Sequence, residues 1–211
     1  MEKGNTKQEI FDAALNLFST KGYEATSVSE IAEAVGIKKA SLYSHFASKQ
    51  EILDSLIEIL KKQYDKNSIF ANTDWDNPTF TKDKANITAD DVTKAITRHV
   101  NYILHDPAIQ KARKMLTIEQ FGNPQMAKIQ TKQNYTDVMN YFIGMMKFLA
   151  RSGKLTDDDT EIIAAQLCLP ISVWINLCDR EPERKNEIFG LIERHVNHFF
   201  KTYNIDNGEQ K

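Results

Sequence analysis

From Ile10 to Leu53 the chain reads IFDAALNLFSTKGYEATSVSEIAEAVGIKKASLYSHFASKQEIL, and this stretch decides the fold. Its first part repeats apolar residues at helical spacing, from Ile10 and Ala14 to Phe18. Gly22 follows closely, and glycine suits the left-handed backbone that ends many helices. The pattern predicts an amphipathic helix that packs one face inward and stops near this glycine.

Two shorter helices are expected next, on either side of a second glycine. Ser27 and Glu30 have the spacing of a capping box, which starts a helix by satisfying its free amide groups. Gly36 ends that helix, and a short segment from Lys39 to Phe46 follows. A helix-turn-helix needs a small residue at the turn, because its two helices meet at a steep angle. The apolar residues that would anchor the pair are Val28, Ile31, Ala32, Val35, Leu42 and Phe46.

The second helix of this pair would present a polar and basic face. No acidic residue lies between Val35 and Gln50, whereas three lysines do. Lysine can contact phosphates or guanine edges, and serine and tyrosine hydroxyls can bond phosphates or bases. A short solvated basic stretch would have the same composition, and Tyr43 could instead serve packing. The place of these residues in the motif favours contact with DNA.

The start of the next helix offers a further phosphate site, because free amide groups gather at a helix N-terminus. Ser48 and Glu51 repeat the capping-box spacing there, and Lys49 adds a positive charge. A long amphipathic helix is expected to follow, with apolar residues from Ile52 to Tyr64.

The rest of the chain is helical in pattern and lacks the alternation and turn signals of strands. Residues 67–89 are polar and contain Pro78, so they are expected to form a loop with at most a short helical turn. Pro170 should kink or weaken the helix that contains it. These patterns define an all-α fold. Further helices are expected at about 90–104, 107–121, 124–151, from the capping residues 156–159 to 177, and at 182–200.

Composition narrows the functional classes. The formal net charge is −2, so a surface that binds nucleic acid would have to be local. No apolar run is expected to span a membrane, and no apolar signal-peptide core follows the polar start. On one helix, Cys168 and Cys178 would lie about 15 Å apart. That is too far for a disulfide, and two such thiols fit a reducing cytoplasm.

Enzyme chemistry is not expected, because no Ser-His-Asp, Cys-His or metal constellation is recognisable. No cofactor is expected either. His195 and His198 share a helical face near Glu193, but no cysteine cluster or metal-binding motif accompanies them. We interpret them as interface or surface histidines and expect no metal site.

The stretch from Ile10 to Leu53 resembles the tetracycline-repressor (TetR) family of bacterial regulators. The resemblance rests on the segments LFSTKGYEATSV, SEIAEAVGI and ASLYSHFASKQEIL and on their spacing. It implies about nine helices, with a helix-turn-helix DNA-binding domain over residues 1–48 and an effector-binding and dimerisation domain over 49–211. By motif position, it implies DNA contacts from Thr26, Ser27, Lys38, Lys39, Ala40, Ser41, Tyr43, Ser44, His45 and Lys49.

The resemblance also implies an effector pocket and a dimer interface in the larger domain. Soft and aromatic side chains suit an adaptable pocket, and they suit an ordinary core as well. The interface is expected on the last two helices, whose apolar residues could also form an intramolecular core. The candidate pocket residues are Tyr102, His105, Met115, Glu119, Tyr135, Met139, Phe142 and Met146. The candidate interface residues are Ile163, Leu167, Trp174, Ile188, Ile192, Val196 and Phe199.

These features predict a cytoplasmic homodimer that binds a palindromic DNA operator and represses transcription until a small molecule releases it. Such a ligand can act only by binding the two states of the protein with different affinity. The alternative is the same scaffold acting as an activator or a protein-interaction regulator, with no small-molecule effector.

Overall fold

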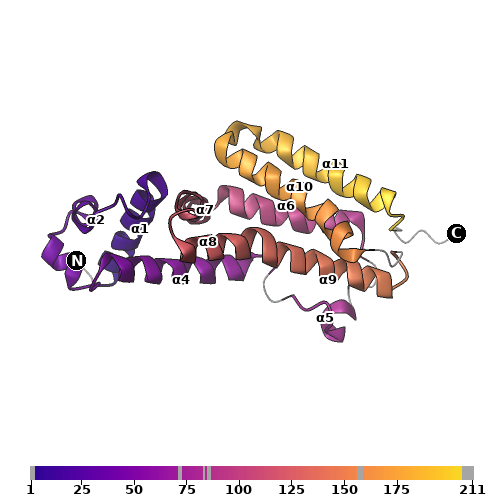
Figure 1. Cartoon of the computed structure of the whole chain (residues 1–211), viewed down its shortest axis with the longest axis horizontal. Coiled ribbons are helices and arrows are strands. Elements are labelled where there is room, and N and C mark those ends of the chain that lie inside the picture. The colour runs from indigo at the N-terminus through magenta and orange to yellow at the C-terminus, as the bar shows by residue number, and fades with distance from the viewer. Residues whose placement is uncertain (1–2, 71–72, 83, 85–86, 156–158, 206–211) are drawn as a thin grey trace. The chain divides into compact units, whose positions relative to one another are not determined.

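The computed structural model describes residues 3–70, 73–82, 84, 87–155 and 159–205. Every regular element in these ranges is helical, which confirms the predicted all-α class. The chain forms two compact units, one of Met1–Lys66 with His105–Gln130 and the other of Asn67–Leu104 with Thr131–Lys211 (Figure 1). The first unit thus contains residues on both sides of position 48, and a functional boundary at that position stays a prediction.

The first unit is built around α1, which packs against α2 and α7 (Figure 1). Helix α7 is distant in sequence, so the N-terminal motif does not fold around its own residues alone. The helices of this unit are α1 (Lys3–Lys21), α2 (Val28–Val35), α3 (Lys39–Tyr43), α4 (Lys49–Asn67), α7 (Pro107–Glu119) and α8 (Pro124–Thr131).

Helix α2 has the ends that the sequence predicts. The Ser27 side chain accepts from the Glu30 amide, and the Glu30 carboxylate accepts from the Ser27 amide, which completes the capping box. At the other end Gly36 has φ +76°, and the Ile37 amide donates back to the Ala32 carbonyl at 2.9 Å. A side chain at position 36 would meet nothing within 4 Å, so only the left-handed backbone requires glycine here.

Helix α3 is shorter than predicted, because its regular part ends at Tyr43 instead of Phe46. The chain keeps its direction for one more turn, since the Phe46 amide still donates to the Leu42 carbonyl at 3.1 Å. Leu42 is fully buried and Phe46 is 4% exposed, which confirms both as the anchors of this segment.

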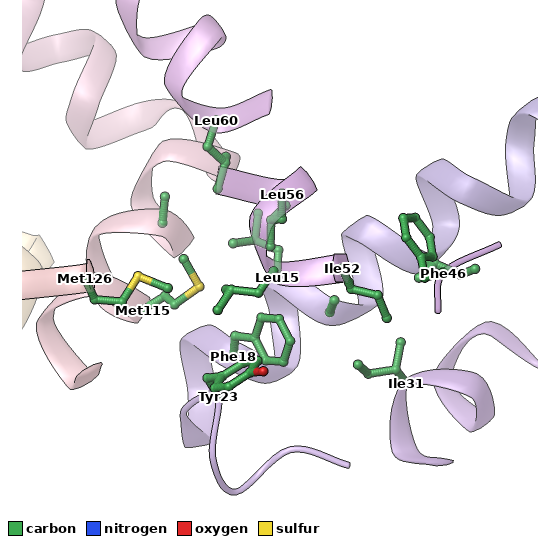
Figure 2. Packing of buried hydrophobic residues seen from close by; sticks show 14 of the residues in the cluster. Leu15, Phe18, Tyr23, Ile31, Phe46, Ile52, Leu56, Leu60, Met115 and Met126 are labelled. Carbon is green, nitrogen blue, oxygen red and sulfur yellow. The ribbon is translucent and has the colours of Figure 1, made fainter. Parts of the chain in front are cut away.

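The core of the first unit joins these anchors to α1, α2, α4 and α7 (Figure 2). Phe46 packs edge-to-face on Phe11 with ring centroids 5.2 Å apart, and Phe18 does the same with Tyr23 at 5.3 Å. Figure 2 shows Met115 and Met126 closing the side of the cluster away from Phe46 and Ile31. The motif is therefore held by an apolar cluster that the chain completes only near residue 126.

In the second unit, α10 packs along both α9 and α11 (Figure 1). A five-residue π-helical segment leads into α9, so the predicted continuous helix over 124–151 contains an irregular turn. Pro78 opens a short helix within the predicted loop, and α10 continues through Pro170. Its elements are α5 (Pro78–Lys82), α6 (Ala89–His105), η1 (Lys132–Thr136), α9 (Asp137–Arg151), α10 (Thr160–Arg180), η2 (Pro182–Arg184) and α11 (Lys185–Thr202). Of the capping residues predicted at 156–159, only Asp159 lies in the described residues, where it caps α10.

The segment before α5 is fastened to α9 through Trp75. Its indole lies directly on Gly144, where a Cβ atom would come within 2.5 Å of the ring. Arg151 donates to the Trp75 carbonyl at 3.1 Å and pairs with the Asp76 carboxylate at 2.7 Å. The absence of a side chain at position 144 is therefore what allows this 6% exposed tryptophan to enter the core.

One helix is longer and more apolar than the composition indicated. Helix α10 is long and apolar enough to cross a membrane by length and composition, although no such run was expected. A core helix of a soluble protein passes the same test, so one such helix is weak support for a membrane span. Only 33% of its most apolar window is buried within the chain.

Replacing Gly144 by alanine is expected to lower the free energy of unfolding by about 1–3 kcal/mol, because the added methyl group must displace Trp75. Gly190→Ala is the matched control, since a Cβ in the middle of α11 would meet only Arg194, at 3.6 Å. That variant should gain about 0.5–1 kcal/mol from the helix preference of alanine. Urea unfolding measures both changes, and a neutral or stabilising Gly144→Ala would contradict the packing described.

Candidate nucleic-acid interface

The polar face of α3 lies open to solvent. Tyr43 is 46% exposed, although it follows the fully buried Leu42 directly in sequence. Neither Lys38 nor Lys39 forms an ion pair with the described part of the chain. Burying one side of a short helix therefore leaves its other side free for a partner. The exposed residues of this face are Lys38, Lys39, Ala40, Ser41, Tyr43 and Ser44, and His45 beside them is half-buried.

Hydroxyl groups near this face differ in what they can offer. Ser44 directly follows α3, is exposed, and its hydroxyl donates to the Ser41 carbonyl at 2.7 Å. Ser27 is exposed but caps α2. Thr26 is only 1% exposed, and its hydroxyl donates to the Gly22 carbonyl at 2.7 Å. Thr26 therefore holds the turn before α2 and does not present its side chain at the surface.

Lys49, predicted to contact phosphate, binds the protein's own backbone in this structure. Its ammonium donates to the carbonyl oxygens of Tyr23 at 2.8 Å and Thr26 at 2.9 Å, and more weakly to that of Glu24 at 3.4 Å. The same ammonium lies 4.1 Å from the centroid of the Tyr23 ring. An ammonium has three N–H donors, so these contacts engage Lys49 in fastening the loop between α1 and α2 to α4.

Tyr23 is held from two further directions. Its hydroxyl donates to the Gln50 side chain at 2.9 Å, and burial raises the pKa of the phenol, which keeps it protonated. Its amide donates to the Glu119 carboxylate at 2.7 Å. Sequence reasoning placed Thr26 and Ser27 of this loop among the DNA contacts, but it missed the bonds that hold Tyr23. A detectable signal is the carboxylate itself, because Glu119 follows Met115 by four residues and shares its apolar face.

An exposed ion pair marks the start of α2. Lys21 bonds the Glu30 carboxylate, which also accepts from the Ser27 amide, and these bonds lower the pKa of Glu30 to about 2. Glu30 therefore stays ionised, and the capping box intact, at any pH near neutrality.

The predicted effector residues do not lie in one unit. Met115 and Glu119 belong to the first unit, where Met115 is 1% exposed in the core and Glu119 binds Tyr23. His105 is exposed at the start of the second segment of that unit. The residues that fall in the second unit are Tyr102, Tyr135, Met139, Phe142 and Met146, of which the last three are buried.

The predicted interface residues are mostly buried inside the protomer. Ile163, Leu167, Ile188, Ile192, Val196 and Phe199 are each at most 4% exposed. Trp174 is half-buried and packs edge-to-face on His195, whose Nε2 lies 2.9 Å from the Leu167 carbonyl oxygen. Contact between α10 and α11 of the same chain thus accounts for the burial of these residues. An intramolecular core of this kind was the alternative to a dimer interface. Both cysteines of α10 are buried and unbridged.

Comparison with known proteins supports the helix-turn-helix class that the fold defines. Residues 10–56 match the family model described as bacterial regulatory proteins, tetR family. A segment of 52 residues is 50% identical to IcaR of Staphylococcus aureus strain Newman, the negative transcriptional regulator of the biofilm operon icaADBC. The IcaR protein of Staphylococcus epidermidis is 48% identical over 52 residues. The chain spans 28% of the length of these curated relatives.

Solved structures extend the likeness in fold to the whole chain. MexZ, a repressor from Pseudomonas aeruginosa, superposes with a TM-score of 0.70 and 17% identity over 95% of this chain and 96% of its own. The fatty acid degradation regulator FadR from Bacillus halodurans has a TM-score of 0.59 and 15% identity over 100% of both chains. The match to the TetR family model thus covers the N-terminal helix-turn-helix stretch, and the likeness over the whole chain is one of fold. The matched family model describes regulatory proteins.

Replacing Lys49 by methionine should lower the free energy of unfolding by about 1–2 kcal/mol, because the carbonyl groups of Tyr23 and Thr26 lose a charged donor. Lys39→Met removes the same charge from an exposed position and should change stability by less than about 0.5 kcal/mol. Thermal and urea unfolding of the two variants provide the comparison. Equal stabilities would show that the Lys49 contacts do not hold the loop.

Proposed function

We propose that this protein is a homodimeric transcriptional repressor that binds a palindromic DNA operator through α3 and is released by a small molecule. In this proposal residues 1–48 read DNA, and residues 49–211 bind the effector and form the dimer. We expect it to work in the cytoplasm, where operator DNA is found.

The observation that carries the proposal is the exposed face of α3. Leu42 and Phe46 anchor the segment in the core, while its lysine, serine and tyrosine side chains are exposed to solvent. A recognition helix needs this division between an anchored side and a side that enters the major groove. The contact set we propose is Ser27, Lys38, Lys39, Ala40, Ser41, Tyr43, Ser44 and His45, with Thr26 and Lys49 supporting them from within the protein.

A dimer is proposed because an operator with two-fold symmetry requires a partner with the same symmetry. The predicted interface residues are mostly used inside the protomer, so the exposed stripe of α10 is the better candidate. Ile162 is 54% exposed and Val173 is 63% exposed, and Leu169 between them is half-buried. Pairing this stripe with a second copy would cover apolar surface that one chain leaves in water.

The effector is proposed to bind in the second unit, whose interior is rich in aromatic side chains. Phe70 packs edge-to-face on Tyr141 at 5.3 Å and on His99 at 4.6 Å. Burial alone raises the pKa of Tyr141 to about 12, so its hydroxyl stays a neutral donor. An apolar, aromatic surrounding with a few polar groups is typical of sites for small molecules. Met139, Phe142 and Met146 are the buried candidates there.

The proposal is tested by capturing sheared source-genome DNA with the purified protein at about 0.15 M salt, where non-specific phosphate attraction is weakened. A few near-palindromic fragments should be enriched. The variant Lys38→Ala with Lys39→Ala should bind those fragments with a salt dependence shallower by about two counterions, because two phosphate contacts are lost.

The matched control replaces Lys61 and Lys62 by alanine, which removes the same charge from another exposed pair. Its salt dependence should equal that of the wild type. Uniform retention of all fragments, or the same loss of binding in both double variants, would argue against α3 as the reading element.

A further inference from the structure

A buried carboxylate ends α7 where the apolar core of the first unit meets the loop before α2. Glu119 is 8% exposed and is the last residue of the helix. Its Oε1 accepts from the Tyr23 amide at 2.7 Å, across 96 positions of sequence. A buried charge is costly unless it is bonded, so this bond has to persist wherever the carboxylate stays buried.

The backbone at Gly22 allows this close approach. Its φ is +89°, and a Cβ atom here would lie 2.7 Å from Glu119 Oε1 and 3.3 Å from Ile118. Gly22 also ends α1, since its amide donates to the Phe18 carbonyl at 3.1 Å. The end of α7 therefore packs against the backbone of Gly22, directly after the end of α1.

Tyr23 is also bound from α4, on its other backbone group. The Lys49 ammonium donates to the Tyr23 carbonyl, and the Gln50 side chain accepts from the Tyr23 hydroxyl. The Glu119 carboxylate accepts from the Tyr23 amide. Ser27, four residues later, caps α2. The bonds at Tyr23 thus hold the chain just before the N-cap of α2, and α2 leads through the Gly36 turn into α3.

We propose that Glu119 is a positioning residue for operator binding, a role that rests on the proposed function. Its carboxylate fixes the Tyr23 amide to α7 and so sets the orientation of the α2–α3 pair relative to α1. Glu119 acts through Tyr23 and does not itself contact DNA. It was a candidate for the effector pocket by sequence, and its bond to Tyr23 assigns it this second role.

The test measures affinity for a captured operator and for an unrelated duplex of equal length. Glu119→Leu should weaken operator binding by about tenfold or more, because the amide loses its acceptor. Affinity for the unrelated duplex should stay within about twofold, since it depends on phosphate attraction and not on helix orientation. Glu119→Gln keeps an acceptor oxygen and should stay within about threefold of the wild type on both duplexes.

The matched control is Asp106→Ala, at the opposite end of the same helix. Asp106 caps α7 by accepting from the amides of Ala108 and Ile109 at 3.0 Å, and its other bond is to the Gln63 side chain of α4 at 2.9 Å. This variant weakens α7 but should keep the ratio of the two affinities. If Glu119→Leu keeps the ratio, or if Asp106→Ala loses it equally, Glu119 has no positioning role. If the wild type itself binds no specific site, the proposed function fails and this inference fails with it.

Discussion

The first unit depends on how the chain between α1 and α2 is fastened. This loop has no apolar run of its own, and its polar backbone groups have to be satisfied close to the core. Lys49 supplies donors to the carbonyl groups of Tyr23 and Thr26, Thr26 closes the turn on Gly22, and Glu119 accepts the Tyr23 amide. Helices α4 and α7 thereby hold one short loop from two sides. The helix-turn-helix pair begins directly after it, so its placement follows from these bonds.

Fastening the loop from within also explains why α3 can expose so many polar groups. It is attached to the rest of the protein through the buried Leu42 and Phe46 and through its contact with α2, while its lysines are exposed. Lysine is thus used in two ways in this motif. Lys49 holds the backbone, whereas Lys38 and Lys39 remain at the surface.

Much of the fold was predictable because its signals are local. Ser27 with Glu30, Gly36, and the spacing of Leu42 and Phe46 each specify structure through neighbours a few positions away. The bond between Glu119 and Tyr23 was not predicted, since the two residues lie 96 positions apart and no local pattern encodes that contact. Apolar periodicity likewise indicated that Leu167 and Ile192 would be buried, without indicating whether the partner was the same chain or a second one. The grouping of α7 and α8 with the N-terminal helices was likewise not predicted, because it arises from tertiary packing between segments far apart in sequence.

We infer that buried bonds hold the backbone at Tyr23 as firmly as a helix is held. Amide hydrogen exchange of the native protein, read at single residues, tests it most directly. The Tyr23 amide should exchange as slowly as the Ile31 amide, which is bonded within α2 to the Ser27 carbonyl. If the Tyr23 amide exchanged at the rate of an unprotected loop amide, Glu119 would not hold the loop.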